Sequence, residues 1–170
     1  CPLSALALDI IPGQKGFGTD TRAAYGNKKN PTIFIVNTRS NASGTVANST
    51  RNGIPVKTGS FRDAVNYNFN NKLILFEVSG TVTVQDTLYL DNNYVTIAGQ
   101  TAPSPGISFR GLKLVVCGHD ILVQHLRSRV GDDSNGVFYD YRDGINVTSA
   151  KGLVPYNVVV DHCSISWAID

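Results

Sequence analysis

Short apolar segments rich in β-branched residues recur along the chain after residue 72. Glycine, asparagine, aspartate or proline separates one segment from the next, as the ends of β-strands require. No stretch between them has the period of an amphipathic helix of ordinary length, which argues against alternating strands and helices. The pattern predicts an all-β fold with these strand segments: Leu73–Val84, Tyr94–Ala98, Ile107–Arg110, Leu112–Val116, Ile121–Val130, Ile145–Thr148 and Val158–Ser166.

One apolar pattern repeats at a spacing that suits a solenoid. Aligning Val95-Thr96-Ile97 with Ile121-Leu122-Val123 and Val158-Val159-Val160 gives spacings of 26 and 37 residues, the second being 26 plus an insertion of 11. The residues from Asp120 to His125 also match those from Asn157 to His162 position for position. A circuit of three strands and their turns has this kind of path length, and extra residues are tolerated in its turns. The repeat predicts a parallel β-helix, in which alternate side chains of each strand point inward and stack.

The residues before the repeats show a different pattern. Residues 1–31 are irregular, Thr32–Val36 is predicted as a strand, and the Asn-, Ser-, Thr- and Gly-rich residues 37–59 are predicted as a long surface loop. The length suits one structural domain. Because the strand pattern begins after residue 72, we divide the chain into an irregular amino-terminal segment, residues 1–71, and the first coils of the β-helix, residues 72–170.

A short helix is predicted at the end of the first segment. Ser60-Phe61-Arg62-Asp63 matches a capping box, in which the Ser60 side chain accepts the amide of Asp63 while Asp63 reaches back. The helix ends in the Asn-rich stretch that begins at Asn66. Because the first coil of a solenoid exposes an apolar cross-section, we expect this helix to cap it. A surface helix without a capping role is the alternative.

Composition supports a strand-rich protein and excludes some partners. Of the 170 residues, 42% are hydrophobic and 16% are charged, against roughly 25% charged residues in an average globular domain. A formal net charge of +2, with no basic cluster interleaved with aromatic residues, gives no basis for a nucleic-acid partner. No apolar run approaches the roughly 18 residues of a membrane span, so we expect no spanning segment.

The amino terminus and the cysteines leave alternatives open. The sequence has no methionine, so we expect a processed or trimmed amino terminus. Cys1 fits the lipid-anchored first residue of a mature lipoprotein, and a disulfide partner or an arbitrary boundary are the alternatives. Cys1, Cys117 and Cys163 are too few and too scattered for a disulfide scaffold or a zinc site. Free thiols, or one bridge and one remaining thiol, both fit.

Seven segments in order, from about residue 13 to the end, carry recognisable motifs. Two of them are specific strings: Ala98-Gly99-Gln100-Thr101-Ala102-Pro103, preceded by Thr96-Ile97, and Asp161-His162-Cys163-Ser164-Ile165-Ser166-Trp167. The others are Gly16-Phe17-Gly18, Gly59–Val65, Leu75–Val82, Gly106–Gly111 and His125–Asp132. Together they resemble the pectate lyases of polysaccharide lyase family one. The resemblance implies a secreted, right-handed parallel β-helix that binds an acidic polysaccharide along one sheet, with calcium as cofactor.

The reaction that this resemblance implies is β-elimination in a uronate polymer. A base must remove a weakly acidic proton beside a carboxylate, and calcium would neutralise that carboxylate. Asp143 resembles the calcium-binding Asp of the family, and Asp170 resembles the acidic position one coil later. Where the family often has a second Asp, this chain has Tyr141, so Asp132 or Asp140 would substitute. The alternative for each Asp is a turn cap that accepts nearby amides.

Two arginines are candidates for substrate binding. Arg127 and Arg129 alternate on one face of a predicted strand, from which they would meet substrate carboxylates bidentately. Solvation, or pairing with nearby Asp residues, is the alternative. Trp167 would stack on a sugar or close a turn, and we expect it to pack in the core or a turn.

Asp161-His162 is predicted to be structural. The resemblance implies that this strand braces the coil beside the groove, and His125 occupies the matching place one coil earlier. Stacked polar side chains on one face therefore explain the pair more simply than catalysis does, and a catalytic role for His162 is the alternative.

The resemblance also implies a catalytic residue outside this sequence, an Arg base on later coils, downstream of Asp170. We therefore expect the amino-terminal part of a longer lyase, inactive alone, whose open coil end is covered by a missing carboxyl-terminal part or a second chain. A non-catalytic extracellular β-helix that binds carbohydrate, as an adhesin or fibre subunit, is the alternative. A hydrolase using Asp132-Asp133 ranks last, because it needs paired carboxylates at a defined separation.

Overall fold

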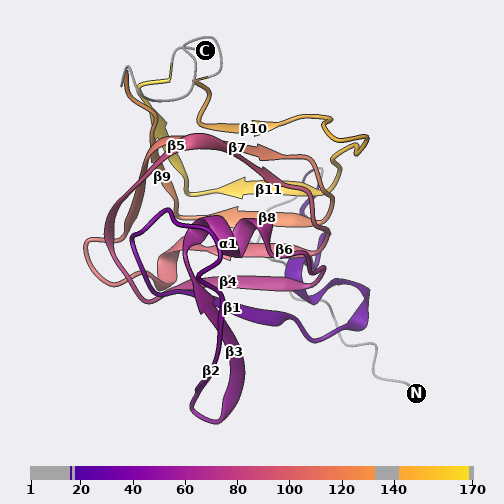
Figure 1. Ribbon diagram of the computed structural model, residues 1–170. Coiled ribbons are helices and arrows are strands. Elements are labelled where there is room, and N and C mark those ends of the chain that lie inside the picture. Colours follow the sequence, from indigo (N-terminus) through magenta and orange to yellow (C-terminus); the bar gives the residue numbers. More distant parts are fainter. Residues whose placement is uncertain (1–15, 17, 133–141, 169–170) are drawn as a thin grey trace.

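Strands dominate the computed structural model, which describes residues 16, 18–132 and 142–168 (Figure 1). The all-β prediction is therefore confirmed. The elements in chain order are the 3₁₀ helix η1 (Ala23–Lys28), β1 (Thr32–Val36), β2 (Ala47–Arg51), β3 (Ile54–Gly59), the helix α1 (Phe61–Asn66), β4 (Lys72–Phe76), β5 (Gly80–Leu90), β6 (Val95–Ala98), the 3₁₀ helix η2 (Gly99–Thr101), β7 (Ile107–Val116), β8 (Ile121–Gln124), β9 (Arg127–Arg129), β10 (Ile145–Val147), β11 (Val158–Asp161) and β12 (Ser164–Ser166).

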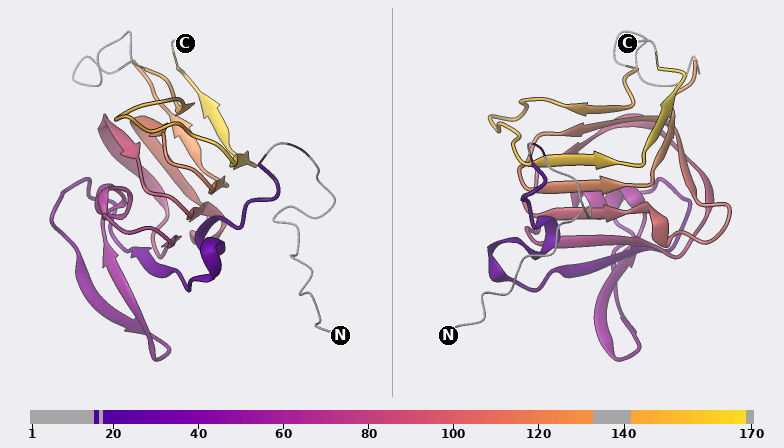
Figure 2. Two further views of the ribbon diagram at one scale, coloured as in Figure 1. Left: turned by 90° about the vertical axis from the view of Figure 1, so that its right-hand side faces the viewer. Right: turned by 180° about the vertical axis from the view of Figure 1, so that it is seen from behind.

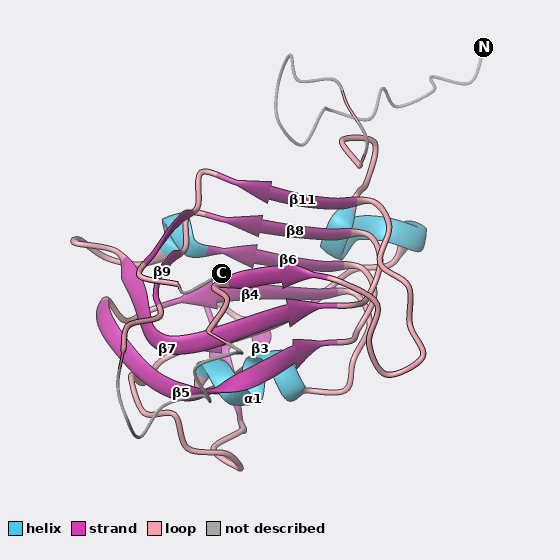
Figure 3. Cartoon of the chain, turned by 90° about the horizontal axis from the view of Figure 1, so that it is seen from above, coloured by secondary structure: helices cyan, strands magenta, loops and turns pink. Residues whose placement is uncertain are grey.

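The strands form two sheets that face each other across a common core (Figure 3). The first sheet has the order β11-β8-β6-β4-β1-β3-β2, and the second has the order β10-β7-β9-β12, with β5 paired to β7. Of the strand pairs in the described residues, only β2 with β3 is antiparallel. From β4 onward the chain passes repeatedly between the two sheets, so that each circuit lies on the one before it.

The strand register confirms the repeat alignment made from the sequence. Val95 pairs with Ile121, and Ile121 pairs with Val158, so the three aligned triplets lie one above another. Ile121 and Val123 are fully buried in the core between the sheets, as alternation predicts. The 26-residue spacing therefore corresponds to one circuit of the chain.

A bend divides the long strand β7 into two parts that face different neighbours. Gly111, at the bend, has a φ of +70°, a conformation that glycine adopts without strain. Before the bend, Ser108 pairs with Arg127 of β9; after it, Leu114 pairs with Ile145 of β10. A full circuit thus presents three strand segments, one in the first sheet and two in the second.

Each circuit enters the first sheet through a left-handed residue. Asn71, Tyr94, Asp120 and Asn157 immediately precede β4, β6, β8 and β11, with φ values of +57°, +60°, +56° and +51°. Three of these four are Asn or Asp, which tolerate this conformation better than most residues. The amides of Asn71, Tyr94 and Asp120 each donate to a carbonyl of the next circuit at 3.1 Å. The same left-handed corner therefore immediately precedes each of these four strands of the first sheet.

Helix α1 contributes its apolar side to the core. The ring of Phe61 packs on Phe109, with centroids 4.3 Å apart, and on Phe76 at 6.0 Å. Ala64 and Val65 on the next turn are fully buried. The helix begins as predicted, because the Ser60 hydroxyl accepts the amide of Asp63 at 3.0 Å.

The other half of the predicted capping box is wrong. The Asp63 carboxylate accepts the amides of Gly44 and Thr45, at 2.9 and 2.6 Å, instead of the Ser60 amide. The Ser60 amide donates to the Thr45 hydroxyl at 2.9 Å. A tertiary contact with the preceding segment has replaced the local one, and it ties the helix to that segment.

The prediction that residues 37–59 form a loop is also wrong, since they contain β2 and β3. The two strands form a hairpin around Asn52-Gly53, whose φ values of +50° and +77° suit a two-residue turn. The hairpin projects beyond the rest of the first sheet (Figure 1). β3 also pairs with β1, which pairs with β4, so the first sheet continues across residue 71. The division of the chain into residues 1–71 and 72–170 stays a prediction.

Lys72, at the start of β4, is a fully buried cation. Its ammonium donates to the carbonyls of Val65 and Tyr67, at 3.0 and 2.8 Å, and to the side-chain oxygen of Asn92 at 2.9 Å. Lys72 thereby satisfies carbonyls at the end of α1. Burial lowers the pKa of Lys72 to about 7, against a smaller opposite effect of Asp91.

Residues around η1 lie on the outer face of the first sheet. η1 packs against β6 and β8 (Figure 2). Ala23 forms a small apolar cluster with Leu122 and Val159, and the Thr21 hydroxyl donates to Asp120 at 2.8 Å. No helix in the described part of the chain is both long and apolar enough to cross a membrane.

Candidate functional site

An open groove lies where β8 and β11 end and the chain turns towards β9 and β12. Its volume is about 390 Å³, and its lining includes Gln100, His125, Arg127, His162 and Ser164. Arg127 and Ser164 pair in register across β9 and β12, so the groove runs over the edge of the second sheet. One of the two predicted substrate-binding arginines, Arg127, and the predicted structural residue His162 therefore line the same groove.

The two histidines of the groove occupy equivalent corners of successive circuits. His125 and His162 follow β8 and β11 directly, and both are left-handed, with φ values of +54° and +50°. Their rings stack with centroids 4.9 Å apart and planes 17° apart. The amide of His125 donates to the carbonyl of Asp161 at 3.1 Å, which joins the two corners. Stacking of the two histidines, expected from the repeat, is confirmed.

A row of polar side chains runs alongside the histidines. Gln100 donates to Gln124 at 3.1 Å, and Gln124 donates to the Asp161 carboxylate at 2.8 Å. The other oxygen of Asp161 lies 2.6 Å from Nδ1 of His162. The bond from Gln124 chiefly, and that to His162 secondarily, lower the pKa of Asp161, so the carboxylate is ionised at neutral pH. These contacts are what the predicted bracing role of Asp161 and His162 requires, and that role stays a prediction.

Arg127 and Arg129 point out from the same face of β9, with buried Ser128 between them. Arg127 donates to the carbonyls of Pro105 and Ile107, at 2.5 and 3.4 Å. These contacts fix its guanidinium but use only part of its five N–H donors.

The second arginine is held by the neighbouring circuit. Arg129 donates to the carbonyl of Ser164 at 2.8 Å and to its hydroxyl at 3.0 Å. Neither Arg127 nor Arg129 has a carboxylate partner among the described residues, so the alternative that they pair with nearby Asp residues is not observed there. Arg110 pairs in register with Arg129, which adds a third arginine to this face.

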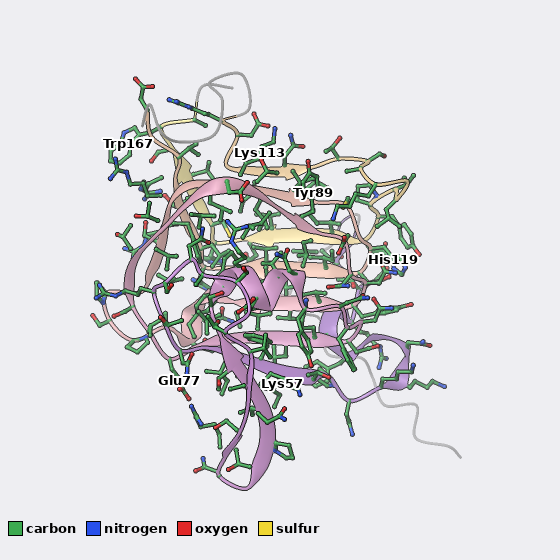
Figure 4. The ribbon with its side chains drawn as sticks, in the orientation of Figure 1. Lys57, Glu77, Tyr89, Lys113, His119 and Trp167 are labelled. Atoms are coloured by element: carbon green, nitrogen blue, oxygen red, sulfur yellow. The ribbon has the colours of Figure 1, made fainter. Side chains whose placement is uncertain are left out.

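Asp143, the first predicted calcium ligand, is held by a cation of the chain. It lies just before β10, and its carboxylate is 2.5 Å from the ammonium of Lys113 on β7 and accepts the side-chain amide of Asn146 at 3.0 Å. The bond from Lys113, followed by that from Asn146, lowers the pKa of Asp143. Figure 4 shows Lys113 at this end of the molecule, near β10. The carboxylate is therefore ionised, as a calcium ligand must be, but it is already paired.

The other predicted ligands do not complete a calcium site in the described part of the chain. Asp132 is almost fully exposed and pairs with Arg142. Asp170 and Asp140 lie outside the described residues. Calcium needs six to eight oxygen ligands, and Asp143 with Asn146 supplies only a small part of such a set. The described residues therefore supply only part of a calcium site, and Asp143, Asp170 and Asp132 stay predicted ligands.

Trp167 is not packed as expected. It is 71% exposed and left-handed, with a φ of +60°, directly after β12 (Figure 4). The Trp167 carbonyl accepts the amide of Gly131 at 3.1 Å, so the backbone is bonded to the preceding circuit while the ring is exposed to solvent. The expectation of core or turn packing is therefore wrong for this side chain.

Several residues of the site were missed by the sequence reasoning. Lys113 and Arg110 belong to β7, and Gln124 and Gln100 lie beside the histidines. A signal for Gln124 existed, since it aligns with Asp161 in the repeat that pairs residues 120–125 with 157–162. No comparable signal existed for Lys113, because the partner of Asp143 depends on where the insertion returns to the sheet.

Of the two cysteines that the structure describes, Cys117 is buried and Cys163 is partly buried, and both are free thiols. Burial raises the pKa of each thiol. Free thiols were one of the two alternatives left open by the sequence. Cys1 lies outside the described residues.

Comparison with known proteins gives relatives along nearly the whole chain. "Probable pectate lyase C" of Neosartorya fischeri is 31% identical over 166 residues, which cover 96% of this chain and 32% of the relative. The proteins of the same name from Aspergillus terreus and Emericella nidulans are 30% and 29% identical over 168 residues, 98% of this chain and 33% of each relative. No family model matches the chain. The resemblance to pectate lyases is confirmed, and the chain spans about a third of the length of these relatives.

Proposed function

We propose that the protein carrying this sequence is a polysaccharide lyase that cleaves an acidic, uronate-containing polysaccharide by β-elimination. The observation that carries the proposal is the similarity to proteins named pectate lyase over 96% of the chain. The arginine face of β9 supports it, because an anionic polymer needs cations to receive its carboxylates.

The fold that we propose is a right-handed parallel β-helix with α1 as its end cap. Parallel pairing throughout β4 to β12, three strand segments per circuit and the recurring left-handed corners support it. The ring of Phe61 against Phe76 and Phe109 supports the capping role, since it places the helix on interior side chains of the first circuits.

Substrate binding is assigned to Arg127 and Arg129. Alternate residues of a strand lie roughly 6.6 Å apart on one face, so two guanidinium groups would meet different sugars of one polymer chain. Because backbone carbonyls already fix Arg127, and Ser164 fixes Arg129, little side-chain freedom is lost on binding. Each guanidinium pairs a carboxylate bidentately and draws electron density from it, which makes the neighbouring proton more acidic.

Calcium is the proposed cofactor, with Asp143, Asp170 and Asp132 as its proposed ligands. When bound, calcium would supply a second positive charge to the carboxylate of the sugar that loses its proton. Lys113 has to leave Asp143, or share it, for Asp143 to serve as a ligand. We assign the base that removes the proton to none of the described residues.

The proposal places the protein outside the cell, where polymers of this kind are accessible. A lipid anchor at Cys1 remains one prediction for its attachment. We also propose that this stretch of the chain is inactive by itself.

Ultraviolet absorbance of the unsaturated uronate product tests the proposed reaction. The protein at its natural length is mixed with polygalacturonate and calcium, and then with a calcium chelator. We expect product to form with calcium and to stop forming with the chelator. Binding of polygalacturonate without any unsaturated product would favour the non-catalytic carbohydrate-binding alternative instead.

Two arginine variants separate the site from general charge effects. Arg127→Ala with Arg129→Ala removes both guanidinium groups of β9. Arg51→Ala is the matched control, because Arg51 lies on the β2–β3 hairpin and is neutralised by Glu77 at 2.5 Å. We expect the double variant to lose at least about tenfold in kcat/KM, as for loss of charge-assisted bonds, and the control to keep its activity.

A further inference from the structure

Three groups capable of binding a metal ion meet at the corner of two successive circuits. His125, Asp161 and His162 each place a ligand atom within 4.8 Å of the other two, and in the described residues they are the only such group of three. We propose that they form a binding site for a divalent transition-metal ion such as Zn²⁺. This site is separate from Asp143, the described calcium-ligand candidate that lies just before β10.

The donor chemistry selects the class of ion. Two imidazoles and one carboxylate suit zinc, copper, nickel or iron, while calcium and magnesium prefer oxygen ligands throughout. Asp161 lies 2.6 Å from Nδ1 of His162, so a carboxylate oxygen and an imidazole nitrogen already converge at this corner. The donor set is therefore that of a transition-metal site with open coordination positions.

The site is held in place before any ion binds. Gln124 donates to Asp161 at 2.8 Å, and the amide of His125 donates to the carbonyl of Asp161 at 3.1 Å. Both histidines follow strands that pair in register, so neither corner can move without disturbing β8 or β11. Binding requires the two stacked rings to turn until one nitrogen of each faces the ion, while the backbone of both corners stays in place.

The site is also accessible. His125 and His162 are exposed, His162 by 65% of its side chain, and both line the open groove. Water reaches the remaining coordination positions from the groove. The ion would join one circuit to the next and would place a positive charge beside Arg127, on the face assigned to the acidic polymer.

Calorimetric titration with ZnCl₂ tests the site. The protein, at its natural length, without a histidine tag and stripped of metal, is titrated in a buffer that does not bind zinc. We expect one equivalent of zinc to depend on His125 and His162, and His125→Ala and His162→Ala each to weaken its binding by at least about tenfold. Equal zinc binding by the wild type and by both variants overturns the proposal.

His119 provides the matched control. Of the three histidines in the sequence, it is the one outside the groove. It also has an aspartate at 2.8 Å, Asp120, but its ring stacks on Tyr156 instead of on another histidine. Figure 4 shows it at the other end of the first-sheet strands from the groove. We expect His119→Ala to bind zinc like the wild type. Loss of the same zinc equivalent in His119→Ala overturns the assignment.

A second measurement guards against misfolded variants. Paramagnetic resonance of one equivalent of Cu²⁺ on the wild-type protein reports nitrogen ligands directly. Two imidazole nitrogens are expected, and one or none contradicts the site. A rise in the melting temperature of the wild type with zinc, absent in the conservative variant His162→Gln, provides the parallel stability readout. These tests use zinc and copper without polysaccharide, so they are independent of the proposed lyase activity.

Discussion

The histidine corner and the segment around Asp143 hold their polar side chains in different ways. At the corner, equivalent residues of successive circuits lie on one another: His125 on His162, and Gln124 beside Asp161. Around Asp143, unlike residues pair across the stack, with Lys113 as the partner. The repeat therefore positions the side chains of the histidine corner, whereas an ion pair positions the segment around Asp143.

The difference teaches how a repeated chain acquires a site. A residue in the repeat is positioned by the circuits above and below it, because strand register fixes its height. Asp143 lies outside the matched repeat and is positioned by its partner Lys113. The repeated region should therefore tolerate change poorly, while the segment around Asp143 should tolerate it well.

The largest expected effect compares two isoleucines at the starts of strands. Ile121, in β8, is fully buried between the sheets, whereas Ile145, in β10, is only partly buried. Ile121→Ala should lower the free energy of unfolding by about 2–5 kcal/mol, and Ile145→Ala by clearly less, because a smaller cavity forms. Urea denaturation measures both. Equal losses would remove the distinction between the two regions.

Two glycines make the same comparison for the backbone. A Cβ added at Gly99 would lie 2.5 Å from the carbonyl oxygen of His125, in the circuit that follows, whereas one at Gly152 would meet nothing within 4 Å. Gly99→Ala should cost more, about 2–3 kcal/mol, because the added methyl would overlap backbone atoms. Gly152→Ala should cost about 1 kcal/mol, from its positive φ alone. A Gly99→Ala protein as stable as Gly152→Ala would show that the corner is not tightly stacked.

Lys72 gives the repeated region a pH dependence. Its pKa is about 7 in the folded protein, against an ordinary value of 10.5 in an unfolded chain, so between these values the unfolded state binds more protons. Stability from this group is thus lowest below pH 7 and rises towards pH 10.5, by at most about 1.4 kcal/mol per pH unit.

Lys72→Met removes that proton uptake. Chemical denaturation of the wild type and Lys72→Met from pH 6.5 to pH 9.5 compares the two slopes. The wild type should gain more stability with rising pH than the variant does. Parallel curves would show that Lys72 stays protonated, with its three acceptors compensating for burial.

The smallest expected effect concerns the ion pair between Lys113 and Asp143. Lys113→Met removes the ammonium that pairs with Asp143, so calcium no longer competes with it. If Asp143 is a calcium ligand, calcium affinity should rise by about 1 kcal/mol, close to fivefold in Kd. Asp143→Asn should weaken calcium binding in the same calorimetric titration. Unchanged affinity in both variants would place the calcium ligands elsewhere.

The sequence predicts the repeated region well because periodicity carries structural information. The match of Asp120–His125 to Asn157–His162 was enough to place the two histidines on equivalent corners. The spacings of 26 and 37 residues, the second containing an insertion of 11, were likewise enough to set the register of Val95, Ile121 and Val158. In each case, one local pattern determines a contact between residues far apart in the chain.

The contacts that were predicted wrongly or missed are ones that no repeat in the sequence signals. Asp63 bonds to Gly44 and Thr45, and Asp143 pairs with Lys113, because the fold brings those segments together. The β2–β3 hairpin is different, since its Asn52-Gly53 turn signal was present in the sequence but lay within a polar stretch. The exposure of Trp167 was misjudged because no pattern in the sequence distinguishes an exposed aromatic ring from a packed one.

Binding of oligogalacturonate tests most directly the assignment of the arginine face of β9 to an acidic polysaccharide. Calorimetry compares the wild type, the Arg127→Ala/Arg129→Ala variant and the Arg51→Ala control, with a fully methyl-esterified oligomer as the uncharged ligand. The expected result is binding of the acidic oligomer by the wild type and the control, weakened at least about tenfold in the double variant and for the esterified ligand. Binding of the acidic oligomer that is equally tight in the double variant, or absent from the wild type, would contradict the proposal.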